Sequence, residues 1–517
     1  MDLFFTAIIE SSKLCLDPIL LLIILVGVIW GNIAGALPGI GPSLAVGVVL
    51  PFTFGMTSVN AIAFLVAINV ACSYGNSIPA ILVGVPGTTS AVLTATDGYA
   101  LHKKGQSGLA LGVQFYAAMT GAFLGIFFYF AMVVPLSGLI YVFLAPEMFA
   151  LYFLGCTAVV SISSDNIVKG LLSAAFGLVV SEVGRDPVSS VLRFAFNADM
   201  RGGIPVMPVV MGILAVSEIL RQMRQSFSWG GEASFSEKWK FPPLKSLWRV
   251  TPSVLMGTVI GQIVGAIPGI GGNTAAFVAY NQSKMMSKHP EEYGHGSIEG
   301  IAANEAAQNA SQCGEMVPTF GLGIPGSSTM VLLFGALMMH GFMPGPMLIK
   351  ENPQLFFASG AGLIASTLML MAMGWFICGA LLKVVTLDRQ LILSGALALC
   401  MLGVYTLNRS TWDVFLLILF GVIGYFMLRY GYMPAGFAIT LVLGDGLESN
   451  LRRGLLLTHK SLWEFLARPW TAVILAISFA LIIYGTIGTV RVARRMAAVR
   501  RQALVEHLAS VSASAKQ

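Results

Sequence analysis

Charged residues are scarce in this sequence: Asp, Glu, Lys and Arg together make up only 10% of its 517 residues. Soluble proteins carry about 25% charged residues, so this composition excludes an ordinary water-soluble domain. Apolar residues make up 56% of the chain, and its mean hydropathy is +0.81. We therefore expect lipid to solvate most of the surface. The net charge of +6 does not indicate nucleic-acid binding, because the positive residues lie in loops between apolar stretches.

Charge is missing altogether from six long stretches: residues 18–96, 106–146, 250–283, 317–349, 354–382 and 469–490. A helix needs about 20 apolar residues to cross a bilayer, so the longest stretches must hold two or more segments. We predict an all-α polytopic membrane protein with about ten to twelve membrane segments, counting hairpins that do not cross fully. No cleavable signal peptide is expected, because the apolar run after Glu10 and Lys13 is too long for one.

Cysteine is also rare, with six residues scattered mostly in apolar segments and no C-x-x-C pair. This pattern is typical of small core residues and excludes a disulfide framework or a cysteine metal site. The signatures G-x-S-x-G, H-E-x-x-H and G-x-x-x-x-G-K-[ST] are missing as well. We therefore expect neither an intramembrane enzyme nor an ATP-driven pump, and no cofactor or resident metal.

Basic residues form two clusters outside the apolar stretches, which predict cytoplasmic segments because positive residues accumulate on that side of a membrane. A basic linker without an orienting role is the alternative. A third group, at residues 452–468, complicates the topology. The two clusters are Arg221, Arg224, Lys238, Lys240, Lys245 and Arg249, and Arg491, Arg494, Arg495, Arg500 and Arg501.

The sequence contains an internal repeat. GNIAGALPGIG at residues 31–41 returns as GQIVGAIPGIG at residues 261–271, with eight of eleven positions identical. Residues 71–87 match residues 310–326 without a gap, and Met207-Pro208 and Met433-Pro434 form a weaker third match. Matched halves with Gly/Pro interruptions are typical of transporters, and we favour an inverted second half. The predicted parts are an N-terminal interfacial segment (1–16), a first membrane repeat (17–225), a basic cytoplasmic linker (226–245), a second membrane repeat (246–455), a C-terminal transmembrane segment (456–490) and a basic, polar tail (491–517).

Four Pro-Gly motifs stand at matching places, around Pro38 and Pro86 in the first half and around Pro268 and Pro325 in the second. Proline and glycine break a helix, and in a membrane broken backbone survives only inside protein or beside a wet cavity. The N–H groups of each restarting helix, with neighbouring hydroxyls and amides, could bind a carboxylate. The alternative is that the motifs are only kinks and caps. The predicted substrate-binding residues are Gly39, Gly41, Ser43, Gly87, Thr88, Thr89, Gly269, Gly271, Asn273, Thr274, Gly326, Ser327 and Ser328.

No arginine or lysine lies within these motifs, so a di- or trianion would need charge compensation from co-bound Na⁺ or protons. The polar run at residues 302–311 has two interpretations: a functional role inside the membrane or hydrogen bonding between helices. Asp97, followed by Gly98 and by the polar residues 102–104, is predicted to lie near a helix end at the membrane interface. The candidate residues for a coupling ion are Asn76, Glu305, Asn309 and Glu315. Loop or cap roles are predicted for Glu147, Asp165, Glu182, Glu218, Asp413 and Glu448.

Over residues 17–490 the chain resembles the large membrane subunit of the tripartite tricarboxylate transporters, the TctA family. The densest blocks of resemblance are GALPGIGPSLAVGVVLPFTFG, YGNSIPAILVGVPGTTS, GAIPGIGGNTAAFVAY and GIPGSSTMVLLFGALMMHGFMPGP. The chain departs from the family's usual A-P-E and A-N-N-A, with Ala-Asn-Glu at residues 303–305 and Ala-Gln-Asn-Ala at residues 307–310. Glu305 and Asn309 lie within these altered segments, so the roles that the resemblance implies for them rest on a changed local sequence.

The resemblance implies a multi-pass permease of the bacterial inner membrane with an elevator-like fold. Its implied partners are a small four-helix membrane subunit and a periplasmic solute-binding protein. The implied activity is import of di- or tricarboxylates such as citrate, driven by a gradient of Na⁺ or H⁺. A carboxylate carrier or anion channel that works without a binding protein is the alternative.

Overall fold

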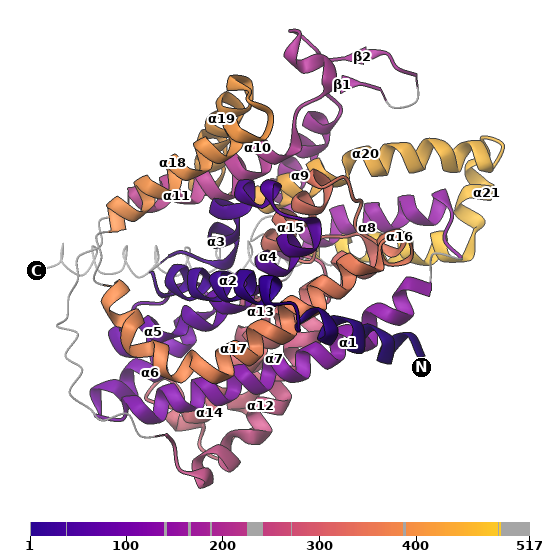
Figure 1. Cartoon of the computed structure of the whole chain (residues 1–517). Helices are drawn as coiled ribbons and strands as arrows, with labels where there is room; N and C mark the ends of the chain where they lie inside the picture. Colours follow the sequence, from indigo (N-terminus) through magenta and orange to yellow (C-terminus); the bar gives the residue numbers. More distant parts are fainter. Residues whose placement is uncertain are drawn as a thin grey trace, which may run out of the picture.

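The computed structural model is almost entirely helical (Figure 1). It describes residues 2–37, 39–138, 142–163, 167–186, 189–224, 241–269, 271–385, 389–483 and 485–487. Pro38, Asp165, most of the predicted linker and the predicted basic tail lie outside the described residues.

The first half of the sequence forms a series of helices and one short β-hairpin. Its elements are α1 (Asp2–Leu14), α2 (Pro18–Ala36), α3 (Pro42–Val49), η1 (Leu50–Gly55), α4 (Ser58–Gly75), α5 (Ser77–Val83), α6 (Ala91–Lys103), α7 (Ser107–Ser137), α8 (Ala145–Ser163), α9 (Ile167–Ser181), β1 (Gly184–Arg185), β2 (Leu192–Arg193), η3 (Asp199–Gly202), α10 (Val206–Met211), the π-helix η4 (Gly212–Val216) and α11 (Ser217–Met223). The strands β1 and β2 pair antiparallel.

Helices are the only regular elements in the described residues of the second half. Its elements are α12 (Leu244–Gly265), α13 (Gly271–Met286), η5 (Pro290–Glu292), α14 (Ile298–Leu322), α15 (Ser328–Met339), α16 (Pro346–Glu351), α17 (Pro353–Val385), α18 (Arg389–Asn408), α19 (Thr411–Arg429), α20 (Pro434–Leu457) and α21 (Leu462–Ala467).

Nine helical segments in the described part of the chain are long and apolar enough to cross a membrane. Three shorter apolar helices, Pro42–Gly55, Ile167–Ser181 and Ser328–Met339, accompany them. These findings confirm an all-α polytopic architecture. The helix α14, which holds the polar run at residues 302–311, is not among the nine, because its polar side chains lower its hydropathy. It is nevertheless buried along nearly its whole length.

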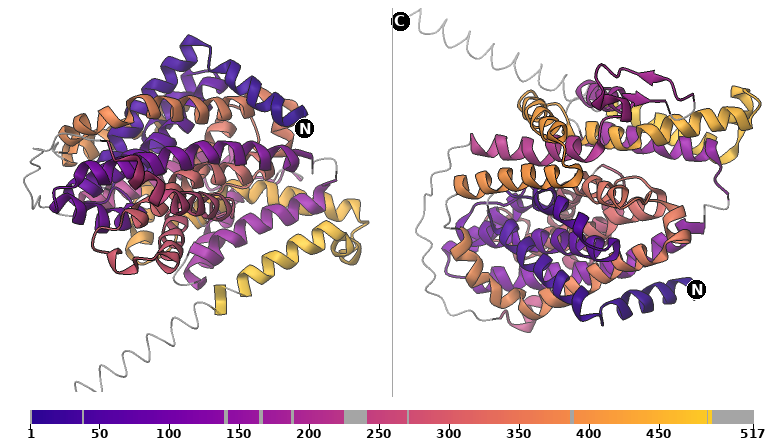
Figure 2. Two further views of the ribbon diagram at one scale, coloured as in Figure 1. Left: turned by 90° about the horizontal axis from the view of Figure 1, so that it is seen from below. Right: turned by 45° about the horizontal axis from the view of Figure 1, so that its top comes forward.

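The two sequence halves are interleaved, so they do not form separate lobes. The second-half helices α14 and α17 pack on α7 and α4 of the first half. The second-half helix α20 lies beside α8 and α9 of the first half, at one end of the molecule (Figure 2). Each half therefore buries much of its apolar surface against the other.

Glycine stripes allow two helix pairs to approach closely. In α2, Gly27, Gly31 and Gly35 face α4, and a Cβ on Gly31 would lie 2.6 Å from the carbonyl oxygen of Ile68. The stripe recurs in α12 at Gly257, where a Cβ would lie 2.5 Å from a carbonyl oxygen of α14, and again at residues 261 and 265. Small residues spaced by four allow this kind of contact between membrane helices. The internal repeat therefore extends from the motifs into helix packing.

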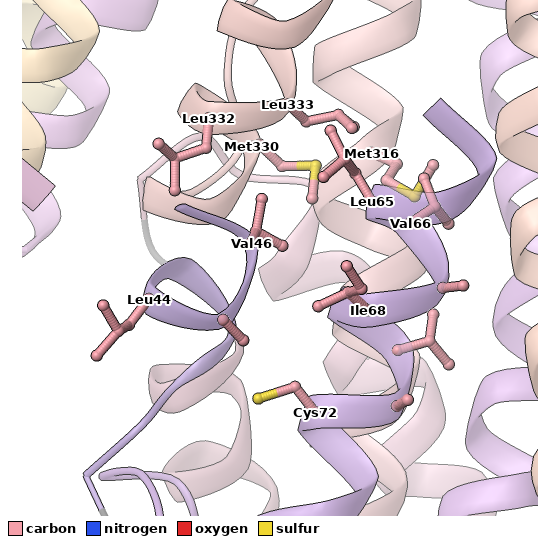
Figure 3. Close-up of a cluster of buried hydrophobic side chains, with 14 of the residues drawn as sticks. Leu44, Val46, Leu65, Val66, Ile68, Cys72, Met316, Met330, Leu332 and Leu333 are labelled. Atoms are coloured by element: carbon pink, nitrogen blue, oxygen red, sulfur yellow. The ribbon is translucent and has the colours of Figure 1, made fainter. Parts of the chain in front are cut away.

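The core beside the first motif draws on both halves. Leu44 and Val46 of α3 and Ile68 and Cys72 of α4 belong to one buried cluster, with residues of α14 and α15 above them in the view (Figure 3). The contributions from α14 and α15 are Met316, Met330, Leu332 and Leu333. These side chains are almost completely buried. The helices α3 and α15, which follow two of the motifs, are therefore held in place by apolar packing in this cluster.

Candidate substrate-binding cavity

A cavity of about 820 Å³ lies where the two halves meet. All but one of the predicted substrate-binding residues line it, and the remaining one, Gly326, is buried. The fold therefore brings together motifs that are more than 200 residues apart in the sequence. The predicted residues in the lining are Gly39, Gly41, Ser43, Gly87, Thr88, Thr89, Gly269, Gly271, Asn273, Thr274, Ser327 and Ser328.

The two pairs of motifs share one backbone geometry. Gly39 and Gly269 have φ angles of 86° and 83°, a left-handed conformation that glycine adopts without steric cost. The N–H of Gly39 donates to the carbonyl of Gly87 (3.1 Å), and the N–H of Gly269 donates to the carbonyl of Gly326 (2.8 Å). In each half, the first Pro-Gly motif is thus hydrogen-bonded to the second.

The helices before the second motif in each half end in the same way. Gly84 closes α5 and Gly323 closes α14, with φ angles of 74° and 73°. Their N–H groups donate to the carbonyls of Pro79 and Pro318. A left-handed glycine is a common helix terminator, so the sequence repeat encodes both the stop and the restart of each broken helix.

The helices α3, α6, α13 and α15, which follow the four motifs, begin at the cavity, as does α20. The hydroxyl of Ser327 accepts a hydrogen bond from the N–H of Met330 (3.4 Å) and caps α15. The N–H of Gly272, in the first turn of α13, donates to the Glu315 carboxylate (2.8 Å). At each of these two helices, one N–H group of the first turn is therefore already paired with an acceptor that the protein supplies.

The two halves are hydrogen-bonded to each other at the wall of the cavity. The N–H of Ser90 donates to Oδ1 of Asn273 (3.2 Å). The amide of Asn304 on α14 donates to the carbonyl of Ser90 (3.1 Å) and to the hydroxyl of Thr94 (2.7 Å). Asn273 thus uses its oxygen to hold the start of α6, so its role is partly structural.

The cavity wall contains Glu218, for which the sequence predicted a loop or cap role, and Arg221, which it placed in a basic cytoplasmic cluster. Glu218 and Arg221 lie on α11, line the cavity, and form a bidentate ion pair with distances of 2.8 and 2.5 Å. The amide of Gln222 donates to Glu218 (2.7 Å) and to the carbonyl of Gly39. Both residues lie in a helix and not in a loop: Glu218 is in the first turn and Arg221 in the last turn of α11, which packs on α19.

Asp97 also differs from its predicted role near a helix end. It lies in the middle of α6 and is fully buried. One carboxylate oxygen accepts the N–H groups of Gly294, Gly296 and Ser297 (2.8–3.0 Å), and the other accepts the hydroxyl of Tyr280 (2.8 Å). Asp97 therefore holds the turn before α14 against α6, and its charge is used inside the fold.

A model of the family described as "Tripartite tricarboxylate transporter TctA family" matches residues 21–439. The chain belongs to this family. A protein of Agrobacterium vitis described as an "Uncharacterized 52.8 kDa protein in TAR-I ttuC' 3'region" is 33% identical over 478 residues, which are 92% of this chain and 95% of the relative. A second A. vitis protein, described as an "Uncharacterized protein in TAR-II ttuC' 3'region", is 32% identical over 45% of this chain and 96% of its own length. No solved structure matches the chain.

The coupling-ion candidates of this TctA-family chain fall into two groups. Asn76 and Glu315 line the cavity, whereas Glu305 and Asn309 lie away from it on α14. The carboxylate of Glu305 is fully buried and accepts the hydroxyls of Ser77 (2.7 Å) and Thr94 (2.5 Å). Its other oxygen has no hydrogen-bond partner among the described residues. The amide of Asn309 donates to the carbonyl of Glu305 within the same helix.

Buried amides of the TctA-family cavity keep unused hydrogen-bonding atoms. Asn76, Gln308 and Gln312 line the cavity and are at least nine-tenths buried. Nδ2 of Asn76 and the Oε1 atoms of Gln308 and Gln312 have no partner among the described residues. Buried polar groups are nearly always paired, so these atoms are available to a polar partner in the cavity. The helix-to-helix alternative also holds in part, because Gln308 donates to the carbonyl of Ser73.

Proposed function

We propose that this TctA-family chain is the permease subunit of a secondary transporter that imports di- or tricarboxylates and depends on a solute-binding protein. The observation that carries the proposal is the cavity, whose wall combines both pairs of Pro-Gly motifs with buried amides and hydroxyls. Backbone N–H groups, hydroxyls and amides are donors that suit carboxylate oxygens. A volume of about 820 Å³ falls within the roughly 300–1,000 Å³ usual for small-molecule sites.

Broken helices support transport through alternating access. In such permeases the substrate sits where half-helices meet near the middle of the membrane, and one part of the protein moves against another around it. The matched hydrogen bonds from Gly39 to Gly87 and from Gly269 to Gly326 would keep each motif pair together during this movement. We extend the proposal to inverted halves that move in an elevator-like manner.

Coupling to Na⁺ or H⁺ is proposed from the buried carboxylates of α14. Glu305 and Glu315 are both almost fully buried. Burying an uncompensated charge inside a membrane protein costs roughly several kcal/mol of free energy. A proton or a Na⁺ ion at either residue would remove that cost. Since Glu315 lines the cavity and already binds the start of α13, binding of a cation there would change the polarity of the substrate site.

The partners that we propose are a small four-helix membrane subunit and a periplasmic solute-binding protein, in the bacterial inner membrane. The description of the family as tripartite supports the existence of further subunits. A carboxylate carrier or channel that needs no binding protein is the second candidate.

Uptake into proteoliposomes distinguishes these candidates. The purified membrane subunits are tested with radiolabelled citrate and succinate, with and without the solute-binding protein, under an inward Na⁺ or proton gradient. We expect uptake only when the binding protein and one of the gradients are both present. Full uptake without the binding protein would favour the second candidate, and loss of gradient dependence would contradict secondary transport.

A further inference from the structure

We infer that Arg221 is the residue of the cavity that recognises a carboxylate group of the substrate, and that Glu218 positions it. This inference rests on the proposed function. Its starting point is the set of described residues that line the cavity. Among these lining residues, Arg221 is the only Lys or Arg. A dianion or trianion held by neutral donors alone would lack a charge-assisted hydrogen bond, and Arg221 can donate one from outside the four motifs.

The ion pair fixes one edge of the guanidinium. Nε and Nη2 of Arg221 donate to the two oxygens of Glu218 at 2.8 and 2.5 Å. Glu218 is held in turn by the amide of Gln222 at 2.7 Å, and that same amide also donates to the carbonyl of Gly39. The arginine is thus connected, through two side chains, to the backbone of the first Pro-Gly motif.

The other edge of the guanidinium is available to a ligand. Arginine carries five donors in a planar fork, and a carboxylate can use two of them at once. Glu218 occupies the Nε side, and no described residue accepts from Nη1 of Arg221. The side chain keeps 41% of its surface accessible, whereas Ser217, Ile219 and Gln222 of the same helix are buried. A substrate carboxylate can therefore bind Arg221 without displacing Glu218.

This arrangement predicts selectivity by charge. Because Glu218 neutralises Arg221 in the empty protein, the pair adds no net charge to the cavity. A substrate with two or three carboxylates can place one on Arg221 and another on the hydroxyls and N–H groups of the motifs, whereas a monocarboxylate can use only one of these. Di- and tricarboxylates should therefore depend on Arg221 more strongly than monocarboxylates do.

The test compares the complete transporter carrying Arg221→Gln, Arg221→Lys or Glu218→Gln with the unmodified protein, using citrate, succinate and acetate as probes. The matched control is Arg224→Gln, because Arg224 lies one turn further on, is exposed, contacts Tyr425 and does not line the cavity. We expect Arg221→Gln to raise KM for citrate and succinate about tenfold or more, because it removes a charge-assisted bidentate contact. Arg221→Lys should recover only part of the affinity, because an ammonium group cannot form the bidentate contact.

KM is chosen because it does not depend on how much folded transporter reaches the membrane. A lower Vmax with unchanged KM in Arg221→Gln would overturn the inference and assign Arg221 a structural role. An equal rise of KM in Arg224→Gln would also overturn it. If the unmodified transporter takes up none of the probes, the proposed function fails first, and that result is distinct from a failure of the Arg221 assignment.

Discussion

At the scale of single residues, the cavity depends on backbone conformation as much as on side chains. Gly39 and Gly269 adopt a left-handed conformation and donate their N–H groups across to the second motif of the same half. A side chain in this conformation costs about 1–2 kcal/mol. Because Gly39 and Gly269 line the cavity, this strain would displace the backbone there and change the positions of several hydrogen-bond donors.

We therefore predict that the double substitution Gly39→Ala and Gly269→Ala reduces carboxylate uptake by about tenfold or more, since 1.4 kcal/mol corresponds to a factor of ten. Gly341→Ala is the matched control, because Gly341 has a φ of 85°, a Cβ there would meet nothing within 4 Å, and it lies outside the cavity. The control should transport nearly normally. Equal losses in both proteins would mean that backbone strain, and not the cavity, explains the effect.

Asp97 shows a different use of a single charge. Its carboxylate accepts three backbone N–H groups from residues 294–297 and one tyrosine hydroxyl. Asp97→Ala would leave these buried donors without an acceptor, at a cost of about 1–3 kcal/mol for each unsatisfied group.

We predict that Asp97→Ala lowers the midpoint of thermal denaturation in detergent much more than Asp199→Ala does. Asp199 lies in the short helix η3, in which no residue is buried. Fluorescence-detected size-exclusion chromatography after heating measures the denaturation midpoint of each variant. Similar midpoints for the two variants would show that Asp97 does not anchor the turn before α14.

At the scale of helices, the internal repeat predicts more than the motifs. The glycine stripes of α2 and α12 occur at corresponding positions and pack against corresponding helices, α4 and α14. Sequence alone identified the broken segments because proline and glycine act locally. It could not show that Gly87 lies opposite Gly39, or that α11 returns to the cavity, because these contacts depend on how distant helices pack.

The helix stripes give a separate prediction about stability. Gly31→Leu and Gly257→Leu would place a side chain where a Cβ already lies 2.6 or 2.5 Å from a carbonyl oxygen of the neighbouring helix. Overpacking of this kind costs about 1–3 kcal/mol, so each variant should unfold several degrees lower. Gly395→Leu in α18, where a Cβ would meet nothing within 4 Å, is the control. Unchanged unfolding of Gly31→Leu would contradict the close packing of α2 on α4.

At the scale of the whole molecule, composition predicts the membrane architecture, and the repeated motifs predict most of the residues that line the cavity. The all-α fold follows from the long uncharged stretches, and all but one of the predicted substrate residues line one cavity. The roles of Glu218, Arg221 and Asp97 did not follow, because a charged residue looks the same in sequence whether it faces water, a cavity or buried backbone donors. The interleaving of the halves was also outside the reach of local patterns.

The central claim is that carboxylates bind in the cavity between the two pairs of motifs. Its most direct test is protection of a single introduced thiol, Thr88→Cys, in a variant whose six native cysteines are replaced and which still transports citrate or succinate. We predict that the transported carboxylate slows maleimide labelling at this position, because Thr88 lines the cavity, and does not slow labelling of Ser410→Cys, which lies outside it. Labelling of Thr88→Cys at the same rate with and without the transported carboxylate would contradict the account.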